Sequence, residues 1–391
     1  MAQHRKHGDF VRVGPNHISI NNPEAALEIY GHKSGFLKSD FYDAFVQVKP
    51  VVFNTRDTEV HQRKRKYMNP AFSARALSAF EPYMDIELLS WKRRLLDMTA
   101  AQDFADIDFS VWTNYLAFDI IGSFAFGKSF GFSEKGHDPY DLIKTIDTRG
   151  EVLTALGALP SWIRPWMRYN YFDSFWSKGL RATTNLEKIG REAFAERKSN
   201  EQPRKDFLSY LFSAKDNVPE TEMVAESISF IVGGSDTTSS TITNFVDIVS
   251  RDKVLQKRLV EEIDTFYPGE VDDNWIPSNE VVSRMTFLNE LLREVMRVRP
   301  TSATGLERVT PAGGKTIAGQ YLPEGTIVSV PTCGLLTDER IFEDAHEIRT
   351  QRWQENDSNK LLDYFLPFSV GPRACIGRNF PNPRTPERAV R

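Results

Sequence analysis

The ten residues FSVGPRACIG at 368–377 place the tightest constraint on what this chain can form. They set Cys375 in a predicted loop between Gly371 and Gly377, where backbone N–H groups can be directed at a thiolate. Arg373, two residues before the cysteine, adds a positive charge that lowers the pKa of a thiol or pairs with an anionic ligand group. The alternative interpretation is a buried structural thiol in a glycine-rich turn.

Cysteine usage and charge exclude several classes of protein. Only Cys333 and Cys375 occur in 391 residues, which excludes a disulfide scaffold and indicates a reducing compartment. Cys333 has no comparable sequence context and is predicted to lie in the core. The net charge of −4 gives no basic excess for nucleic-acid binding, and the 40% apolar content excludes a disordered chain.

The hydrophobic pattern predicts helices over most of the chain and strands in only two regions. Strands are expected at 10–13 and 17–20 around a turn, and again within 315–330, which turns at 323–325. The clearest predicted helices are 24–30, 80–98, 110–126, 185–197, 220–250 and 285–297. Loops are predicted at 33–57, 131–139, 160–171 and 199–205, and none is a clear domain linker. The patterns therefore predict one mainly α domain over residues 1–391 with a small β part.

The predicted helix 220–250 contains two adjacent glycines, Gly233 and Gly234. Each glycine costs about 1 kcal/mol relative to alanine in a helix, so the pair needs a reason. Thr237, which follows Asp236, is expected to hydrogen-bond to a carbonyl one turn earlier and to open the helix locally. Such a groove would admit a flat ligand and O₂ beside a proton-delivering hydroxyl. A kink, or close packing against a neighbouring helix, is the alternative.

Taken together, the cysteine loop and this helix resemble the cytochrome P-450 family of haem-thiolate monooxygenases. The loop matches F-x-x-G-x-R-x-C-x-G, which is expected by chance in such a chain with a probability on the order of 10⁻⁴. The helix matches [AG]-G-x-[DE]-T-[TS]. The resemblance implies a mainly α fold with a small β part, and a haem b whose iron takes Cys375 as its axial ligand.

The resemblance also assigns roles to the residues around that ligand. Thr237 and Asp236 would relay protons to the distal oxygen, which is general acid catalysis. The cofactor-binding residues implied in the two motifs are Gly233, Gly234, Phe368, Gly371, Arg373 and Gly377.

Two further sets of residues match the family. Glu294 and Arg297, followed by Pro300, fit its E-x-x-R helix, and Arg352 stands where a later loop supplies a third member of a buried structural cluster. Glu290 and Arg293 form an overlapping E-x-x-R. We consider it the weaker match, because Pro300 lies at the family's distance from Glu294 and Arg297. A surface ion pair of little energetic value is the alternative for either.

Haem propionates need cations or hydrogen-bond donors. His61 and Arg65 are four residues apart, which places them on one face of a predicted helix. Arg308 and Arg373 are the other two candidates for propionate contact. The neighbouring Arg63, Lys64 and Lys66 are expected to form a solvated basic face, which could also help an acidic reductase domain to dock.

The reaction implied by the resemblance is the insertion of one oxygen atom from O₂ into a C–H bond, with electrons from NADPH through NADPH–cytochrome P-450 reductase. Phrases at 40–45, 53–57, 80–83, 114–122 and 149–152 resemble the fungal benzoate para-hydroxylase group, and the pisatin-demethylase group is more distant. The implied substrate is therefore a small aromatic acid, with fungal secondary-metabolite oxidation as the alternative. Aromatic residues in 36–53 could line its pocket or serve ordinary packing.

The ends of the chain depart from the family, whose members carry a hydrophobic anchor and lie at the cytosolic face of the endoplasmic reticulum membrane. No apolar run here reaches the roughly 18 residues of a spanning helix, so a cytosolic or peripheral location is expected for this chain. Prolines in the atypical tail 378–391 preclude the helix and β region that the family places there. A truncated, non-catalytic haem-binding fragment is therefore an alternative of a different class, as is a helical interaction protein without haem.

Overall fold

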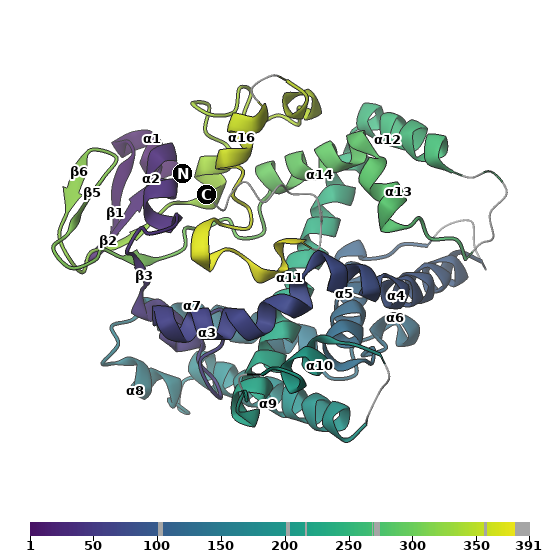
Figure 1. Cartoon of the computed structure of the whole chain (residues 1–391), viewed down its shortest axis with the longest axis horizontal. Coiled ribbons are helices and arrows are strands. Elements are labelled where there is room, and N and C mark those ends of the chain that lie inside the picture. Colours follow the sequence, from purple (N-terminus) through teal and green to yellow (C-terminus); the bar gives the residue numbers. More distant parts are fainter. Residues whose placement is uncertain are drawn as a thin grey trace. The chain divides into compact units, whose positions relative to one another are not determined.

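The computed structural model describes residues 1–100, 105–200, 204–215, 217–267, 269, 274–355 and 358–379. It divides into two compact units, a first unit of Met1–Ser39 with Ser240–Arg391 and a second unit of Asp40–Ser239 (Figure 1). The division falls within the long helix α11, Glu220–Arg251. The predicted single domain over 1–391 stays a prediction. Most of the predicted tail, from residue 380 onward, lies outside the described residues.

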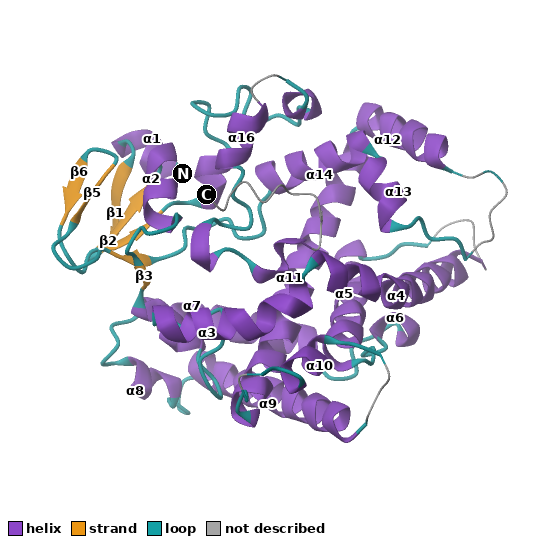
Figure 2. Cartoon of the chain, viewed as in Figure 1, coloured by secondary structure: helices purple, strands orange, loops and turns teal. Residues whose placement is uncertain are grey.

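The first unit holds all the strands of the described chain. Figure 2 draws strands in orange. Its strands are β1 Phe10–Gly14, β2 His17–Ile20, β3 Leu37–Lys38, β4 Arg308–Val309, β5 Lys315–Ile317, β6 Gln320–Leu322 and β7 Ile327–Ser329. Its helices are α1 Ala2–His7, α2 Pro23–Tyr30, α12 Lys253–Phe266, α13 Asn279–Arg284, α14 Thr286–Val298, α15 Thr332–Leu336 and α16 Ser358–Tyr364, with 3₁₀ turns η3 Thr350–Trp353, η4 Gly371–Arg373 and η5 Ile376–Asn379.

The strands of the first unit form two sheets. Five strands pair in the order β1-β2-β7-β4-β3, in which β2 and β7 are parallel and the other neighbours antiparallel. The predicted hairpin at 10–13 and 17–20 is present as β1 and β2. The predicted β region 315–330 divides between the sheets, because left-handed φ angles at Ala318 and Gly319 turn β5 back onto β6, while β7 joins β2.

The described residues of the second unit form helices and loops, with no strand. Its elements before α11 are η1 Asp40–Phe45, α3 Thr58–Met68, η2 Asn69–Phe72, α4 Ala74–Ala100, α5 Phe109–Phe126, α6 Phe132–Lys135, α7 Leu142–Ala158, α8 Arg164–Arg168, α9 Ser174–Ser199 and α10 Phe207–Phe212. Predicted loops at 33–57, 131–139 and 160–171 thus contain short helical turns. Helix α9 begins earlier than the predicted 185, because the Asp173 carboxylate caps it by accepting hydrogen bonds from Phe175 N and Trp176 N.

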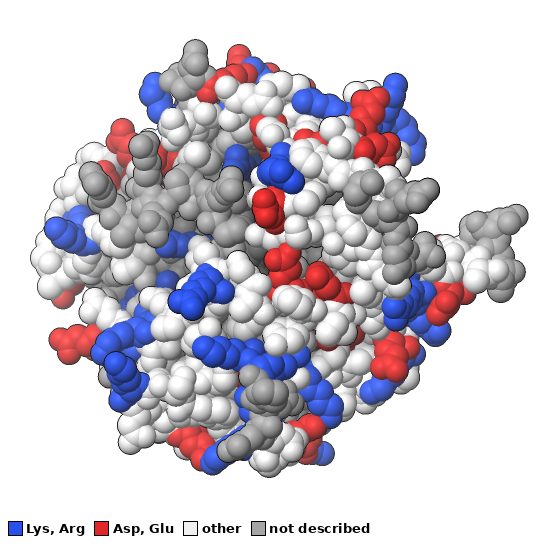
Figure 3. Space-filling view, turned by 45° about the vertical axis from the view of Figure 1, so that its right-hand side comes forward, with Lys and Arg blue, Asp and Glu red and all other residues white. Residues whose placement is uncertain are grey.

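Among the described residues, no helix combines the length and apolar character needed to cross a bilayer. On the face drawn in Figure 3, Lys and Arg side chains are interspersed with Asp and Glu side chains. This mixture agrees with the nearly balanced charge of the sequence.

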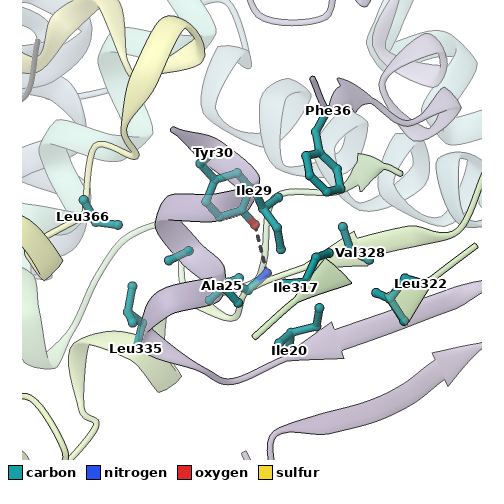
Figure 4. Close-up of a cluster of buried hydrophobic side chains, with 12 residues drawn as sticks. Ile20, Ala25, Ile29, Tyr30, Phe36, Ile317, Leu322, Val328, Leu335 and Leu366 are labelled. Carbon is teal, nitrogen blue, oxygen red and sulfur yellow. Dashed lines mark hydrogen bonds between the residues drawn. The ribbon is translucent and has the colours of Figure 1, made fainter. Parts of the chain in front are cut away.

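Helix α2 packs on the five-stranded sheet through an apolar core that includes Ile20, Ile29 and Val328 (Figure 4). Asn22 starts the helix by accepting hydrogen bonds from Glu24 N and Ala25 N. Tyr30 ends it with a hydroxyl that accepts a 2.9 Å bond from Val330 N and donates a 2.8 Å bond to Leu306 O. Leu366, in the segment leading to the cysteine loop, belongs to the same core.

Aromatic rings form a core of the second unit. Phe207 of α10 lies within ring-contact distance of Phe72, Phe80, Phe124 and Phe230, at 4.5–6.3 Å between centroids. These rings come from η2, α4, α5 and α11. The packing therefore ties the first half of α11 to the helices that precede it.

The carboxylate of Glu294 on α14 is the polar centre of the first unit. It accepts hydrogen bonds from the guanidinium of Arg297 at 2.9 and 2.8 Å, from Trp353 Nε1 at 3.1 Å and from Arg349 N at 2.8 Å. Arg352 Nε lies 3.2 Å from it. Glu294 and Arg297 are fully buried and Arg352 nearly so. The structure thus brings together the three residues of the predicted structural cluster, and Arg297 also donates to three backbone carbonyls, one at the end of α15 and two in the following loop.

We expect Glu294→Gln to lower the free energy of unfolding by about 3–5 kcal/mol, because it leaves two buried guanidiniums without their carboxylate. Urea unfolding followed by circular dichroism measures this. Glu343→Gln is the matched control, since Glu343 is an exposed partner of Arg349, and it should produce no measurable change. Equal unfolding midpoints for wild type and Glu294→Gln would contradict the role given to this cluster.

Candidate haem-thiolate site

The cysteine loop is anchored on the end of α2. Gly371 has a left-handed φ of +74°, and a Cβ at this position would lie 2.2 Å from the carbonyl oxygen of Tyr30. Only glycine fits such a position without strain. The loop then closes through a 2.9 Å hydrogen bond from Cys375 N to Phe368 O. These contacts fix the backbone and leave the side chain of Cys375 exposed.

Three cations lie together in the first unit near this loop. Lys38 and Arg308 are directly opposite each other across the β3–β4 pair, and both are almost fully buried. Burial, followed by the charges of Arg308 and Arg373, holds the pKa of Lys38 well below its usual value. The Arg308 guanidinium also lies 5.0 Å from the Tyr30 ring centroid and donates to Glu307 O.

This donor set fits the haem that the cysteine motif implies. An exposed thiol offers a ligand for iron, and three clustered cations, of which Lys38 and Arg308 are buried, fit the two propionates. Two of the cations, Arg308 and Arg373, were predicted from the sequence. Lys38 was missed, because a lysine at the end of a two-residue strand carries no sequence signal of burial.

In the second unit, the hydroxyl of Thr237 donates a 2.9 Å hydrogen bond to Gly233 O, one turn earlier on α11. The predicted bond is therefore present, but α11 remains α-helical through this segment, so the predicted local opening is not seen. The Thr237 hydroxyl thus bonds to the backbone oxygen of Gly233 while the α-helix continues unbroken. Thr237 and Gly233 are both exposed on the same side of the helix.

The two glycines of α11 have different surroundings. A Cβ at Gly234 would lie 2.5 Å from Ile121 Cδ1 and 3.2 Å from Ile121 Cβ, so α5 packs too closely for a side chain. A Cβ at Gly233 would meet no heavy atom within 4 Å. Gly234 therefore matches the close-packing alternative, whereas Gly233 leaves open space beside Thr237.

Asp236 follows the two glycines on α11 and is influenced by a carboxylate of helix α7. Burial, followed by the charge of Asp147 on α7, raises the pKa of Asp236 to about 6, and a hydrogen bond from Ser235 opposes the shift. A carboxyl with this pKa is mostly ionised at neutral pH and is readily protonated. This property suits a group that passes protons.

Helix α3 carries the other predicted propionate partners. His61 is buried and Arg65 half-buried, one turn apart on one face. The prediction of a solvated face is wrong for Lys64, whose side chain is 2% exposed. Its Nζ lies 3.0 Å from Glu222 and 3.5 Å from Glu226 on α11. Two carboxylates on another helix compensate the buried ammonium. The sequence around Lys64 could not reveal this burial, because both carboxylates come from a distant part of the chain.

The predicted site residues thus divide between the units. The first unit contains Phe368, Gly371, Arg373, Cys375, Gly377 and Arg308, and the second contains His61, Arg65, Gly233, Gly234, Asp236 and Thr237. Within each unit, the residues of each motif lie close in the fold as well as in the sequence.

Comparison with known proteins gives consistent matches. A family model described as "Cytochrome P450" matches residues 1–382. "Benzoate 4-monooxygenase bphA" of Aspergillus niger is 37% identical over 409 residues, which cover 96% of this chain and 78% of that protein. "Cytochrome P450 monooxygenase ORF11" of Penicillium roqueforti is 32% identical, with 96% and 78% covered. The solved "cytochrome P450DA heme domain" superposes with a TM-score of 0.78 at 17% identity, covering 95% of this chain and 80% of that one.

We expect Gly234→Ala to lower the free energy of unfolding by about 1–3 kcal/mol, because its methyl group would overlap Ile121. Gly233→Ala is the matched control on the same helix. It meets no atom and should gain up to about 1 kcal/mol from helix propensity. Urea unfolding of both variants measures the difference, and equal effects would show that the approach of α5 does not require Gly234.

Proposed function

Because the chain belongs to the cytochrome P450 family, we propose that it is a haem-thiolate monooxygenase that inserts one oxygen atom from O₂ into a C–H bond of a small aromatic substrate. The family and the fold imply a haem iron. The observation that carries the proposal is the exposed Cys375 thiol in a loop held by Gly371, with three cations nearby. The proposal treats residues 1–391 as a single haem-thiolate domain.

In this proposal Cys375 binds the iron as a thiolate, while Phe368, Gly371 and Gly377 shape the loop around it. When bound, haem supplies O₂ activation, and thiolate ligation favours O–O cleavage. Lys38, Arg308 and Arg373 hold propionate oxygens, and the burial of Lys38 and Arg308 supports this role, since buried cations are stabilised by anionic groups. His61 and Arg65 are the corresponding donors on α3.

Proton delivery is assigned to Thr237 and Asp236. The Thr237 hydroxyl is held in place by its bond to Gly233 O, and the space above Gly233 leaves room for a ligand. The raised pKa of Asp236 lets its carboxyl gain and lose a proton near neutral pH. Together they form a donor and its acidic partner on one turn of α11.

The electrons are proposed to come from NADPH through a cytochrome P-450 reductase at the cytosolic face of the endoplasmic reticulum membrane. For the substrate we propose a benzoate-like aromatic acid, because the relative at 37% identity is named as a benzoate 4-monooxygenase. Oxidation of another fungal metabolite is the second candidate. It is favoured by the several relatives that are named only as cytochrome P450 monooxygenases.

The test is a reconstituted reaction of the full chain with a fungal reductase, NADPH, benzoate and ¹⁸O₂. One labelled oxygen atom in a hydroxylated product is expected. NADPH oxidation without any labelled product, for benzoate and for neutral aromatics alike, would contradict the proposed monooxygenase function.

In the same assay, Thr237→Ala is expected to reduce product formed per NADPH by at least about tenfold and to release hydrogen peroxide instead, because a positioned proton donor is lost. Thr237→Ser restores a hydroxyl and should recover coupling. Thr238→Ala is the control for an exposed neighbouring threonine and should leave coupling unchanged. Unaltered coupling in Thr237→Ala would refute the proton-delivery role.

A further inference from the structure

Arg149 on α7 is a buried cation whose bonding is incomplete. Its side chain is 8% exposed, and its one hydrogen bond is a long one of 3.3 Å from Nη2 to Phe45 O. Among the described residues, its Nε has no hydrogen-bond partner and its guanidinium forms no ion pair. Burial, followed by the charge of Arg168, lowers the pKa of Arg149 to about 10.

Other buried arginines of the second unit are compensated in the usual way. Arg197 is about as buried as Arg149 and places Nε 2.5 Å from an oxygen of Asp206. Arg164 lies 3.3 Å from Asp40 and donates to three carbonyls. A guanidinium has five N–H donors, and buried charges are normally paired. Unlike Arg164 and Arg197, Arg149 therefore has no carboxylate partner among the described residues.

A second guanidinium makes this region more positive. Arg168 of α8 donates to Ala44 O at 2.6 Å and to Val46 O at 3.4 Å, beside the carbonyl that Arg149 contacts. Its charge is close enough to affect Arg149. Two cations at the end of η1, neither in an ion pair among the described residues, would attract a bound carboxylate.

Aromatic rings cluster on η1 and beside it. Phe41 contacts Phe45 at 5.3 Å between ring centroids, and Phe53 contacts Tyr42 and Phe45 at 5.6 and 6.0 Å. Ring edges and faces of this kind bind another arene through apolar contact and favourable ring geometry. Arg149 reaches this cluster through the backbone oxygen of Phe45. A guanidinium and aromatic rings are the two kinds of group that an aromatic acid requires, one for its carboxylate and one for its ring.

Helix α7 connects this region to the proposed proton-delivery residues. Its residues Arg149, Leu153 and Leu156 share one face, and the two leucines pack against Ala44 of η1. Elsewhere on α7, Asp147 is near enough to Asp236 to raise the pKa of that carboxyl. Helix α7 therefore carries both Arg149 and a carboxylate that lies close enough to α11 to influence Asp236.

We propose that Arg149 binds the carboxylate of a small aromatic acid, whose ring packs against Phe41, Phe45 and Phe53. The inference rests on the proposed monooxygenase function and names the substrate class of that site. Arg149 is thereby a specificity-determining residue, which distinguishes aromatic acids from neutral aromatic compounds.

The test compares benzoate with benzamide, which has nearly the same shape and no charge. Both are titrated by calorimetry at pH 7.5 into the full chain, expressed with haem supplied. Benzoate should bind wild type more tightly. Arg149→Met should weaken benzoate binding by about 10- to 100-fold, the value of a lost charged hydrogen bond, and leave benzamide binding unchanged. Arg149→Lys should bind benzoate with an affinity between those of wild type and Arg149→Met.

Arg181→Met is the matched control, because Arg181 is an exposed arginine of the same unit. It should bind both compounds as wild type does. Circular dichroism establishes that each variant folds, and if Arg149→Met does not, Arg149→Lys decides, since it retains the charge but loses the forked donor geometry. Equal wild-type affinity for benzoate and benzamide, no benzoate binding, or equal benzoate affinity in wild type and the Arg149 variants would overturn the inference.

Failure of the inference and failure of the proposed function are distinguishable. Oxygenation of neutral aromatics with no preference for acids would overturn the role of Arg149 and leave the monooxygenase proposal intact. Arg149-dependent benzoate binding without any oxygenated product would support the carboxylate site and contradict the monooxygenase proposal.

Discussion

A charge removed from water must find an opposite charge, and this constraint governs the polar interior of the molecule. Glu294 satisfies it completely, because its carboxylate serves Arg297 and Arg352 and also accepts hydrogen bonds from Trp353 and the Arg349 backbone. The cluster secures the loop 337–353 to α14. In the second unit, Lys64 is satisfied by two glutamates of α11 in the same manner.

The same constraint identifies the regions that are suited to ligands. Lys38 and Arg308 are buried opposite each other with Arg373 near, so their mutual repulsion is best relieved by a dianionic group. Arg149 and Arg168 form a second positive region, and both donate hydrogen bonds to the backbone at η1, which carries part of an aromatic cluster. The first region suits haem propionates and the second a substrate carboxylate. One principle thus supports both the proposed cofactor contacts and the proposed substrate class.

Short motifs predicted the contacts between residues that lie close together in the sequence. The spacing of Thr237 from Gly233 was enough to predict their hydrogen bond, and E-x-x-R was enough to pair Glu294 with Arg297. Burial of Lys64 and Arg149 could not be predicted, because it is created by α11 and η1, more than 100 residues away in the chain. For the same reason, the pairing of β7 with β2 could not be read from local alternation.

The central claim is that Cys375 binds haem iron as a thiolate. The most direct measurement is the reduced, CO-bound difference spectrum of this 391-residue chain, expressed with haem supplied, beside the Cys375→Ala variant. The account predicts a strongly red-shifted Soret band for the wild-type chain and its loss in the variant. A band typical of histidine or protonated-thiol ligation in the wild type, or an unchanged spectrum in the variant, would contradict it.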